Sequence, residues 1–98
     1  MDGWRRVAAR RLPPYDSVVP DKEADTRLCR AFGIWVRELR ERRKLTQADV
    51  AARVGITPSY LWQIESGQRN PTLAVVVRLA RALNVKPGKL VARLDEVE

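Results

Sequence analysis

Residues that start and stop helices recur at short intervals along this chain, and they constrain its fold more than any other feature. A threonine precedes each of three short segments with helical apolar spacing, at Thr46, Thr57 and Thr72. A threonine hydroxyl in this place accepts a hydrogen bond from a first-turn backbone N–H. Gly55 and Gly67 follow the first two segments, and glycine readily adopts the left-handed conformation that ends helices. No strand pattern is found, so the chain is expected to be all-α.

These signals predict five helices. Asp21 or Asp25 caps the first, which runs to about Lys44. The next helices are expected at 47–54, from Pro58 to just before Gly67, from 73 to about 83 with Asn84 as its stop, and from 87 to 94. The side chains expected to face inward are Leu28, Phe32, Val36, Leu39, Val50, Ala51, Val54, Leu61, Ile64, Leu73, Val76, Leu79, Ala80, Leu83, Leu90 and Leu94.

Residues 1–24 differ from the rest and are expected to form an N-terminal extension to a domain at 25–98. Pro13, Pro14 and Pro20 interrupt regular structure there, and the stretch is interpreted as a short amphipathic helix or a flexible basic arm. On the first helix, Ile34 and Trp35 are expected to form an exposed apolar pair. The extension folds over this pair, or the pair makes an oligomer contact.

Composition excludes several functions. Among 98 residues there is no histidine and a single cysteine, Cys29, so no zinc cluster, intrachain disulfide or histidine-based catalysis is expected. We expect no cofactor, no metal and no enzyme activity. No apolar run is long enough to span a membrane and no secretory signal is visible, so a cytoplasmic location is expected. The net charge of +7 favours an anionic partner.

The stretch 47–66 has the spacing of two helices that cross closely over a short turn. Ala51 is small enough for a close contact, Gly55 supplies the turn, and Leu61 with Ile64 faces the core. The pattern predicts a helix-turn-helix, and the alternative is an ordinary helical hairpin.

The second helix of this pair has a polar outer face. At about 100° per residue, Ser59, Trp62 and Gln63 lie opposite Leu61 and Ile64. Glutamine can pair with adenine and serine with several bases, so these three are predicted to contact base edges in the major groove. Glu65 falls on the flank of the buried side.

The run from Phe32 to Val91 resembles the phage repressor and Cro-like family of helix-turn-helix regulators, also called XRE-like. The resemblance rests on LTQ, then A-x-x-V-G, then I-E-S-G and N-P-T-L, in this order and at the family's spacing. It implies a five-helix, lambda-repressor-like domain that binds double-stranded DNA as a homodimer, usually to control transcription.

The resemblance also implies roles for individual residues. Arg40 and Glu65 match a structural ion pair between the first and third helices. The predicted phosphate contacts are Gln47, Tyr60, Arg69 and Asn70.

The resulting prediction is a sequence-specific DNA-binding dimer that represses transcription and acts at the nucleoid. The alternative is an antitoxin or co-activator of the same fold, with a protein partner bound through residues 1–24 or through Ile34 and Trp35. The operator, the regulated genes and the signal are not specified by the sequence.

Overall fold

The computed structural model describes residues 21–97, which are helical with short connections and contain no strand. The helices are α2 (Lys22–Arg42), α3 (Gln47–Val54), α4 (Pro58–Glu65), α5 (Leu73–Ala82) and α6 (Pro87–Ala92), and a 3-10 turn, η2 (Arg93–Glu96), follows α6. The all-α, five-helix expectation is therefore confirmed. The predicted extension 1–24 falls largely outside the described residues, and α2 already begins within that range.

Side-chain caps set the beginnings of four helices. The Asp21 carboxylate, and not that of Asp25, accepts from the backbone N–H groups of Glu23 and Ala24 at 3.0 Å each. Thr57 and Thr72 cap α4 and α5 through their hydroxyls, as predicted. Thr46 does more, because it forms a reciprocal capping box with Asp49, with bonds of 3.0 and 2.9 Å.

The predicted stops also hold. Gly55 and Gly67 have φ of 82° and 78°, and Asn84 has φ of 56°, all in the left-handed region. The first helix ends at Arg42, slightly before the predicted Lys44, because Lys44 itself adopts φ of 56°.

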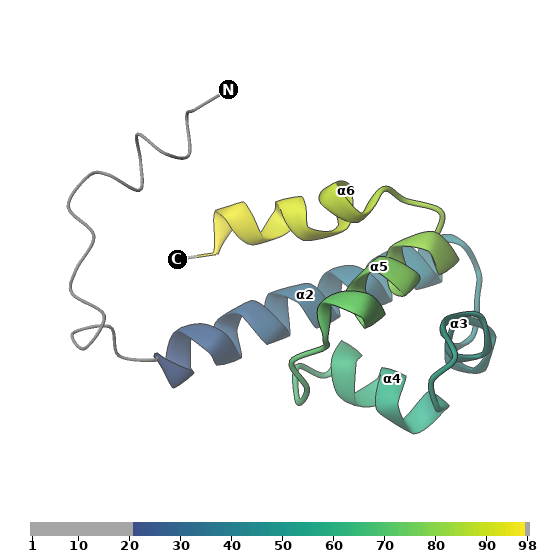
Figure 1. Ribbon diagram of the computed structural model, residues 1–98, viewed down its shortest axis with the longest axis horizontal. Coiled ribbons are helices and arrows are strands. Elements are labelled where there is room, and N and C mark those ends of the chain that lie inside the picture. Colours follow the sequence, from purple (N-terminus) through teal and green to yellow (C-terminus); the bar gives the residue numbers. More distant parts are fainter. Residues whose placement is uncertain (1–20, 98) are drawn as a thin grey trace.

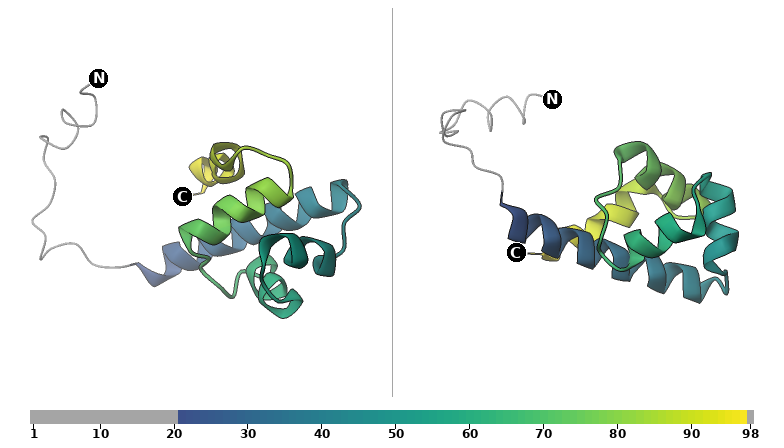
Figure 2. Two further views of the ribbon diagram at one scale, coloured as in Figure 1. Left: turned by 45° about the vertical axis from the view of Figure 1, so that its right-hand side comes forward. Right: turned by 90° about the horizontal axis from the view of Figure 1, so that it is seen from below.

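The helices pack in three layers. α2 and α5 form the middle, α3 and α4 lie on one side, and α6 with η2 lies on the other (Figure 1 and Figure 2). The side chains that fill the centre come from α2 to α6; the largest fully buried ones are Val36, Val50, Val54, Leu61, Ile64, Leu79, Leu83 and Leu90. The α3–α4 pair is thus held on a shared core.

Gly33 allows α2 and α4 to approach closely. A Cβ atom at this position would meet the carbonyl oxygen of Ile64 and would lie 2.6 Å from that of Glu65. Since these are backbone atoms of a packed helix, no side chain could move aside to make room. The absence of a side chain at Gly33 therefore fixes how near the two helices lie.

Two residues expected in the core are exposed. Leu73 is 79% exposed and Leu28 is 37% exposed. The inner face of α5 is set by Val75 and Leu79, and Leu73 lies about 200° from Val75 around the helix. Leu28 lies one turn before Phe32, the first buried residue of α2, and borders a hollow together with Val91 and Leu94. Leu94 and Val76 are half-buried against the core.

The prediction that Ile34 and Trp35 form an exposed pair on α2 is correct for Ile34 and wrong for Trp35. Ile34 is 57% exposed, but Trp35 is half-buried against the core. The guanidinium groups of Arg42 and Arg93 lie over the Trp35 ring, 5.5 and 4.1 Å from its centroid. This cation–π stacking covers the indole and links α2 to η2. The predicted packing of the extension on this pair lies outside the described residues.

Candidate nucleic-acid interface

The outer face of α4 presents the three side chains predicted to read bases. Ser59 is exposed, Trp62 is 50% exposed and Gln63 is half-buried, while Leu61 and Ile64 on the opposite side are fully buried. The sequence prediction of the two faces of this helix is therefore confirmed. Glu65 is the only acidic residue in α4, and it is buried at 7% exposure. The outer face consequently carries no negative charge.

The Glu65 carboxylate is held by Arg40, as the resemblance implies. Arg40 donates from Nε to Oε2 at 2.7 Å and from Nη2 to Oε1 at 3.0 Å. Its Nη1 donates to the Leu45 carbonyl at 2.9 Å, a partner that the sequence did not reveal. These hydrogen bonds raise the pKa of the Arg40 guanidinium above its ordinary value, mainly through Glu65. A fork-shaped pair of this kind connects α2 to α4 with a fixed geometry.

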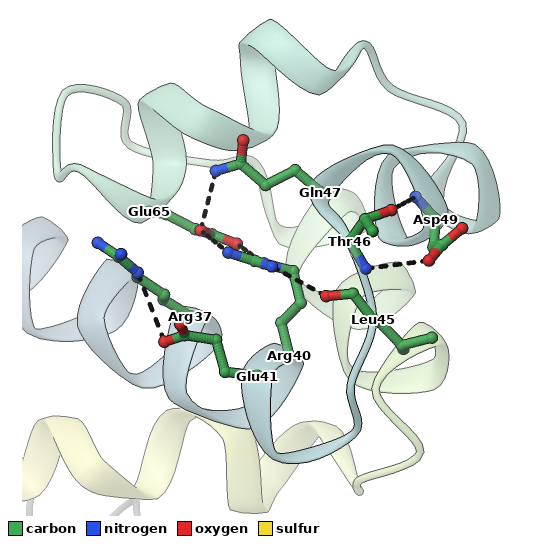
Figure 3. A network of polar contacts seen from close by, with 8 residues as sticks. All are labelled: Arg37, Arg40, Glu41, Leu45, Thr46, Gln47, Asp49 and Glu65. Carbon is green, nitrogen blue, oxygen red and sulfur yellow. Dashed lines mark hydrogen bonds and ion pairs between the residues drawn. The ribbon is translucent and has the colours of Figure 1, made fainter.

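Gln47, the predicted phosphate contact at the start of α3, also reaches Glu65. Its Nε2 donates to Glu65 Oε1 at 3.1 Å, so side chains from α2 and α3 meet on one carboxylate of α4 (Figure 3). One amide hydrogen of Gln47 is engaged in this bond, and the group has a second one. First-turn backbone N–H groups have no partner within their helix, so the N-terminus of α3 can also donate to an anion.

Arg69, in the loop after α4, folds back onto that helix. Its Nε donates to Gln63 Oε1 at 2.9 Å, and its Cζ lies 5.6 Å from the centroid of the Tyr60 ring. Tyr60, Gln63 and Arg69 therefore form one cluster, which joins two predicted phosphate contacts to a predicted base contact. This bond was not predictable from the sequence, because it depends on the path of the turn at Gly67.

Asn70 lies apart from this cluster. It is exposed and borders a hollow that also involves Asp25 and Cys29 of α2. Its neighbourhood thus includes a carboxylate.

Further positive charge gathers between α3 and α5. Arg53, Arg78 and Arg81 border a shallow hollow there. Arg78 donates to the Val54 carbonyl at 3.3 Å and Arg53 to the Ala82 carbonyl at 3.5 Å. Their charges are not neutralised by these neutral acceptors, so they add to the positive field of the domain.

The described residues offer little for metal or thiol chemistry. Within residues 21–97, His, Cys, Asp and Glu side chains do not gather in groups of three that could hold a metal ion. Burial, and secondarily the charge of Asp25, raises the pKa of the Cys29 thiol, which therefore stays protonated at neutral pH.

In the part of the chain that the structure describes, no helix has both the length and the apolar character that crossing a bilayer requires.

Residues 31–94 match the sequence profile of a family described as a helix-turn-helix domain. The match covers α3 and α4 together with the helices that support them. The chain belongs to the Cro-like helix-turn-helix family. It thus carries the type of DNA-binding domain found in transcription regulators.

Two relatives illustrate the range of this helix-turn-helix family. The chain is 45% identical over 58 residues to the HTH-type transcriptional regulator y4dJ of Sinorhizobium fredii, covering 59% of this chain and 75% of the relative. It is 33% identical over 76 residues to multiprotein-bridging factor 1 of Debaryomyces hansenii, covering 78% of this chain but 48% of that protein.

Solved helix-turn-helix structures show the same fold. The restriction-modification controller protein C.AhdI from Aeromonas hydrophila superposes with a TM-score of 0.62 at 39% identity, covering 63% of this chain and 94% of that one. The clp gene regulator ClgR from Corynebacterium glutamicum superposes with a TM-score of 0.66 at 20% identity, covering 69% of this chain and 72% of that one.

Proposed function

We propose that the protein binds double-stranded DNA in a sequence-specific manner, as a homodimer, and represses transcription. The recognition helix is α4 and lies in the major groove, so that Ser59, Trp62 and Gln63 meet base edges. The observation that carries this proposal is that the outer face of α4 carries no acidic side chain. The one acidic residue of this helix, Glu65, is buried and paired with Arg40. An unpaired carboxylate on that face would repel phosphate. The binding unit is residues 25–98, extended back to Lys22, where α2 begins.

Phosphate contacts supply affinity in this proposal, and base contacts supply sequence preference. Gln47, Tyr60, Arg69 and Asn70 are assigned to the phosphates. The first three lie in or beside the polar contacts around α4, and Asn70 follows directly in the same loop. The protein acts at the nucleoid and needs no cofactor and no catalytic group.

The dimer is supported by apolar residues left exposed on α5 and α6. Leu73 on α5 is 79% exposed and Val91 on α6 is 38% exposed. A second copy of the chain would cover such residues and remove them from water. Two recognition helices related by a two-fold axis read half-sites about 10 base pairs apart.

Selection of duplexes from a random pool at 150 mM salt tests the function, with wild type and Gln63→Ala side by side. We expect a palindromic consensus that loses preference at particular positions in the variant. Light scattering of the complex should give two chains per site. A failure to enrich any sequence would overturn the proposal.

The second candidate function is a protein-interaction module, either co-activator or antitoxin. It is favoured by the likeness to a relative named multiprotein-bridging factor 1. The partner would bind through residues 1–24 or the exposed Ile34, whereas Trp35 is shielded by its two arginines. Two results together would support this function. The duplex selection would yield no consensus, and a protein partner that binds wild type would no longer bind the Ile34→Ser variant.

A further inference from the structure

The bond between Arg69 and Gln63 orients the Gln63 amide. An arginine Nε–H is a donor and has no acceptor capacity, so the amide atom that faces it at 2.9 Å is the carbonyl Oε1. The Nε2 group, with its two hydrogens, is then directed to the opposite side of the amide. Arg69 therefore determines which end of Gln63 is available to a ligand.

The position of Arg69 is fixed from two sides. Gln63 accepts from its Nε, and its guanidinium carbon lies 5.6 Å from the centroid of the Tyr60 ring. Both contacts come from α4, so Arg69 is coupled to the helix although it lies in the following loop. Its terminal nitrogens remain further donors beside the Gln63 amide.

Together the two side chains make a surface rich in donors. One lone pair of Oε1 is occupied by Arg69, and the positive guanidinium beside it opposes the approach of another group that carries a partial positive charge. In the major groove, adenine presents an acceptor (N7) and an amino donor (N6), whereas guanine presents two acceptors, N7 and O6. The donor-rich pair matches guanine and disfavours the adenine amino group.

We propose that Gln63 and Arg69 read one guanine as a unit, with Arg69 as the positioning residue for Gln63 in addition to the phosphate contact assigned to it above. This inference rests on the proposed DNA-binding function and deepens it. A glutamine alone would be assigned to adenine through a two-bond contact, as the sequence suggested. The structure changes the expected base because Arg69 occupies one lone pair of the Oε1 acceptor that adenine needs and places a positive charge beside it.

The test repeats the duplex selection with the full chain and three further variants. Arg69→Ala removes both the bond and the charge. Arg69→Lys keeps the charge but places a methylene where Arg69 has Nε–H. Gln68→Ala is the matched control, because it removes an exposed amide of the same loop and leaves Gln63 and Arg69 in place. Circular dichroism verifies that every variant folds.

We expect one position of the selected consensus, called here the guanine column, at which wild type enriches guanine. This enrichment should disappear in Gln63→Ala. In Arg69→Ala and Arg69→Lys that column should lose its preference for guanine over adenine by roughly tenfold, which is the discrimination of a single good base contact. Arg69→Lys should keep the salt dependence of wild type, and Gln68→Ala should keep the column.

Several results would overturn the assignment while leaving the proposed function intact. One is an adenine in the column that depends on Gln63. Another is a guanine column that both Arg69 variants preserve while affinity falls equally for all sequences, since Arg69 would then contact phosphate alone. If wild type enriches nothing, the proposed function fails and this assignment fails with it.

Discussion

Arg40 and Glu65 join α2 to α4 through two hydrogen bonds of 2.7 and 3.0 Å, in a site where both side chains are largely shielded from water. The pair lies 25 residues apart in sequence, and Gln47 brings a third helix to the same carboxylate. The orientation of α4 thus depends on one polar centre as well as on apolar packing.

Breaking this pair from one side should destabilise the fold strongly. Arg40→Met leaves the Glu65 carboxylate buried without its cation, and we expect the free energy of unfolding to fall by about 3–5 kcal/mol. Urea denaturation measures the change. Arg40→Met combined with Glu65→Met should cost less than the sum of the two single variants, because the double variant leaves no buried charge unpaired. Additive costs would show that the two side chains do not interact.

Gly33→Ala should destabilise the domain because the new methyl group meets the backbone of α4. Overpacking of this kind costs about 1–3 kcal/mol, measured as a lower midpoint in urea. Gly88→Ala is the matched control, since no heavy atom lies within 4 Å of the added Cβ in the short helix α6. That control should be neutral or stabilising by about 0.4–1 kcal/mol. Equal effects at both positions would contradict the close approach of α2 and α4.

The capping box at the start of α3 should make stability depend on pH in acid. Hydrogen bonds from Thr46 lower the pKa of the Asp49 carboxyl, first from its backbone N–H and then from its hydroxyl. The folded state therefore prefers ionised Asp49, and its contribution is complete above the unfolded pKa of about 3.9. It is lost as pH falls through the lower, folded value.

Thermal melts of wild type and Asp49→Asn, from neutral pH to below the unfolded pKa of the Asp49 carboxyl, check the prediction. The difference in stability should be largest at neutral pH and should shrink as the solution becomes acidic. A difference that grows on acidification would contradict the direction of the pKa shift.

DNA affinity should depend steeply on salt. If a dimer makes 6–10 phosphate contacts, its association constant should fall by about 10³–10⁵ between 50 and 200 mM salt. Fluorescence anisotropy with a labelled duplex measures this slope. Arg69→Ala should reduce the slope by about one contact per half-site, and Ser59→Ala, which carries no charge, should leave it unchanged. A flat response in wild type would argue against phosphate binding.

Helix bounds were predictable from sequence because caps act locally. Thr46 and Gly55 lie within three or four residues of the groups they satisfy, so their effect requires no knowledge of the tertiary fold. The two faces of α4 followed from helical periodicity for the same reason. Which of Asp21 and Asp25 caps α2 was open, since both residue types are suitable.

Features that depend on contacts between distant elements were not predictable. Leu73 looks like a core residue in sequence, but its exposure depends on which face of α5 meets α3. Trp35 is covered by Arg93, which is 58 positions away and reaches it through the path of α6 and η2. The bond from Arg69 to Gln63 likewise depends on the course of a turn.

The close approach at Gly33 has a consequence for the nucleic acid. Because the backbone of α4 abuts α2 and the acid of α4 is locked to Arg40, this helix has little freedom to adjust its tilt. The ordering cost on the protein side of such a complex is then small, and any mismatch in curvature is absorbed by the duplex. Operators with easily deformed pyrimidine–purine steps between their half-sites should be preferred, at base pairs that the protein never touches.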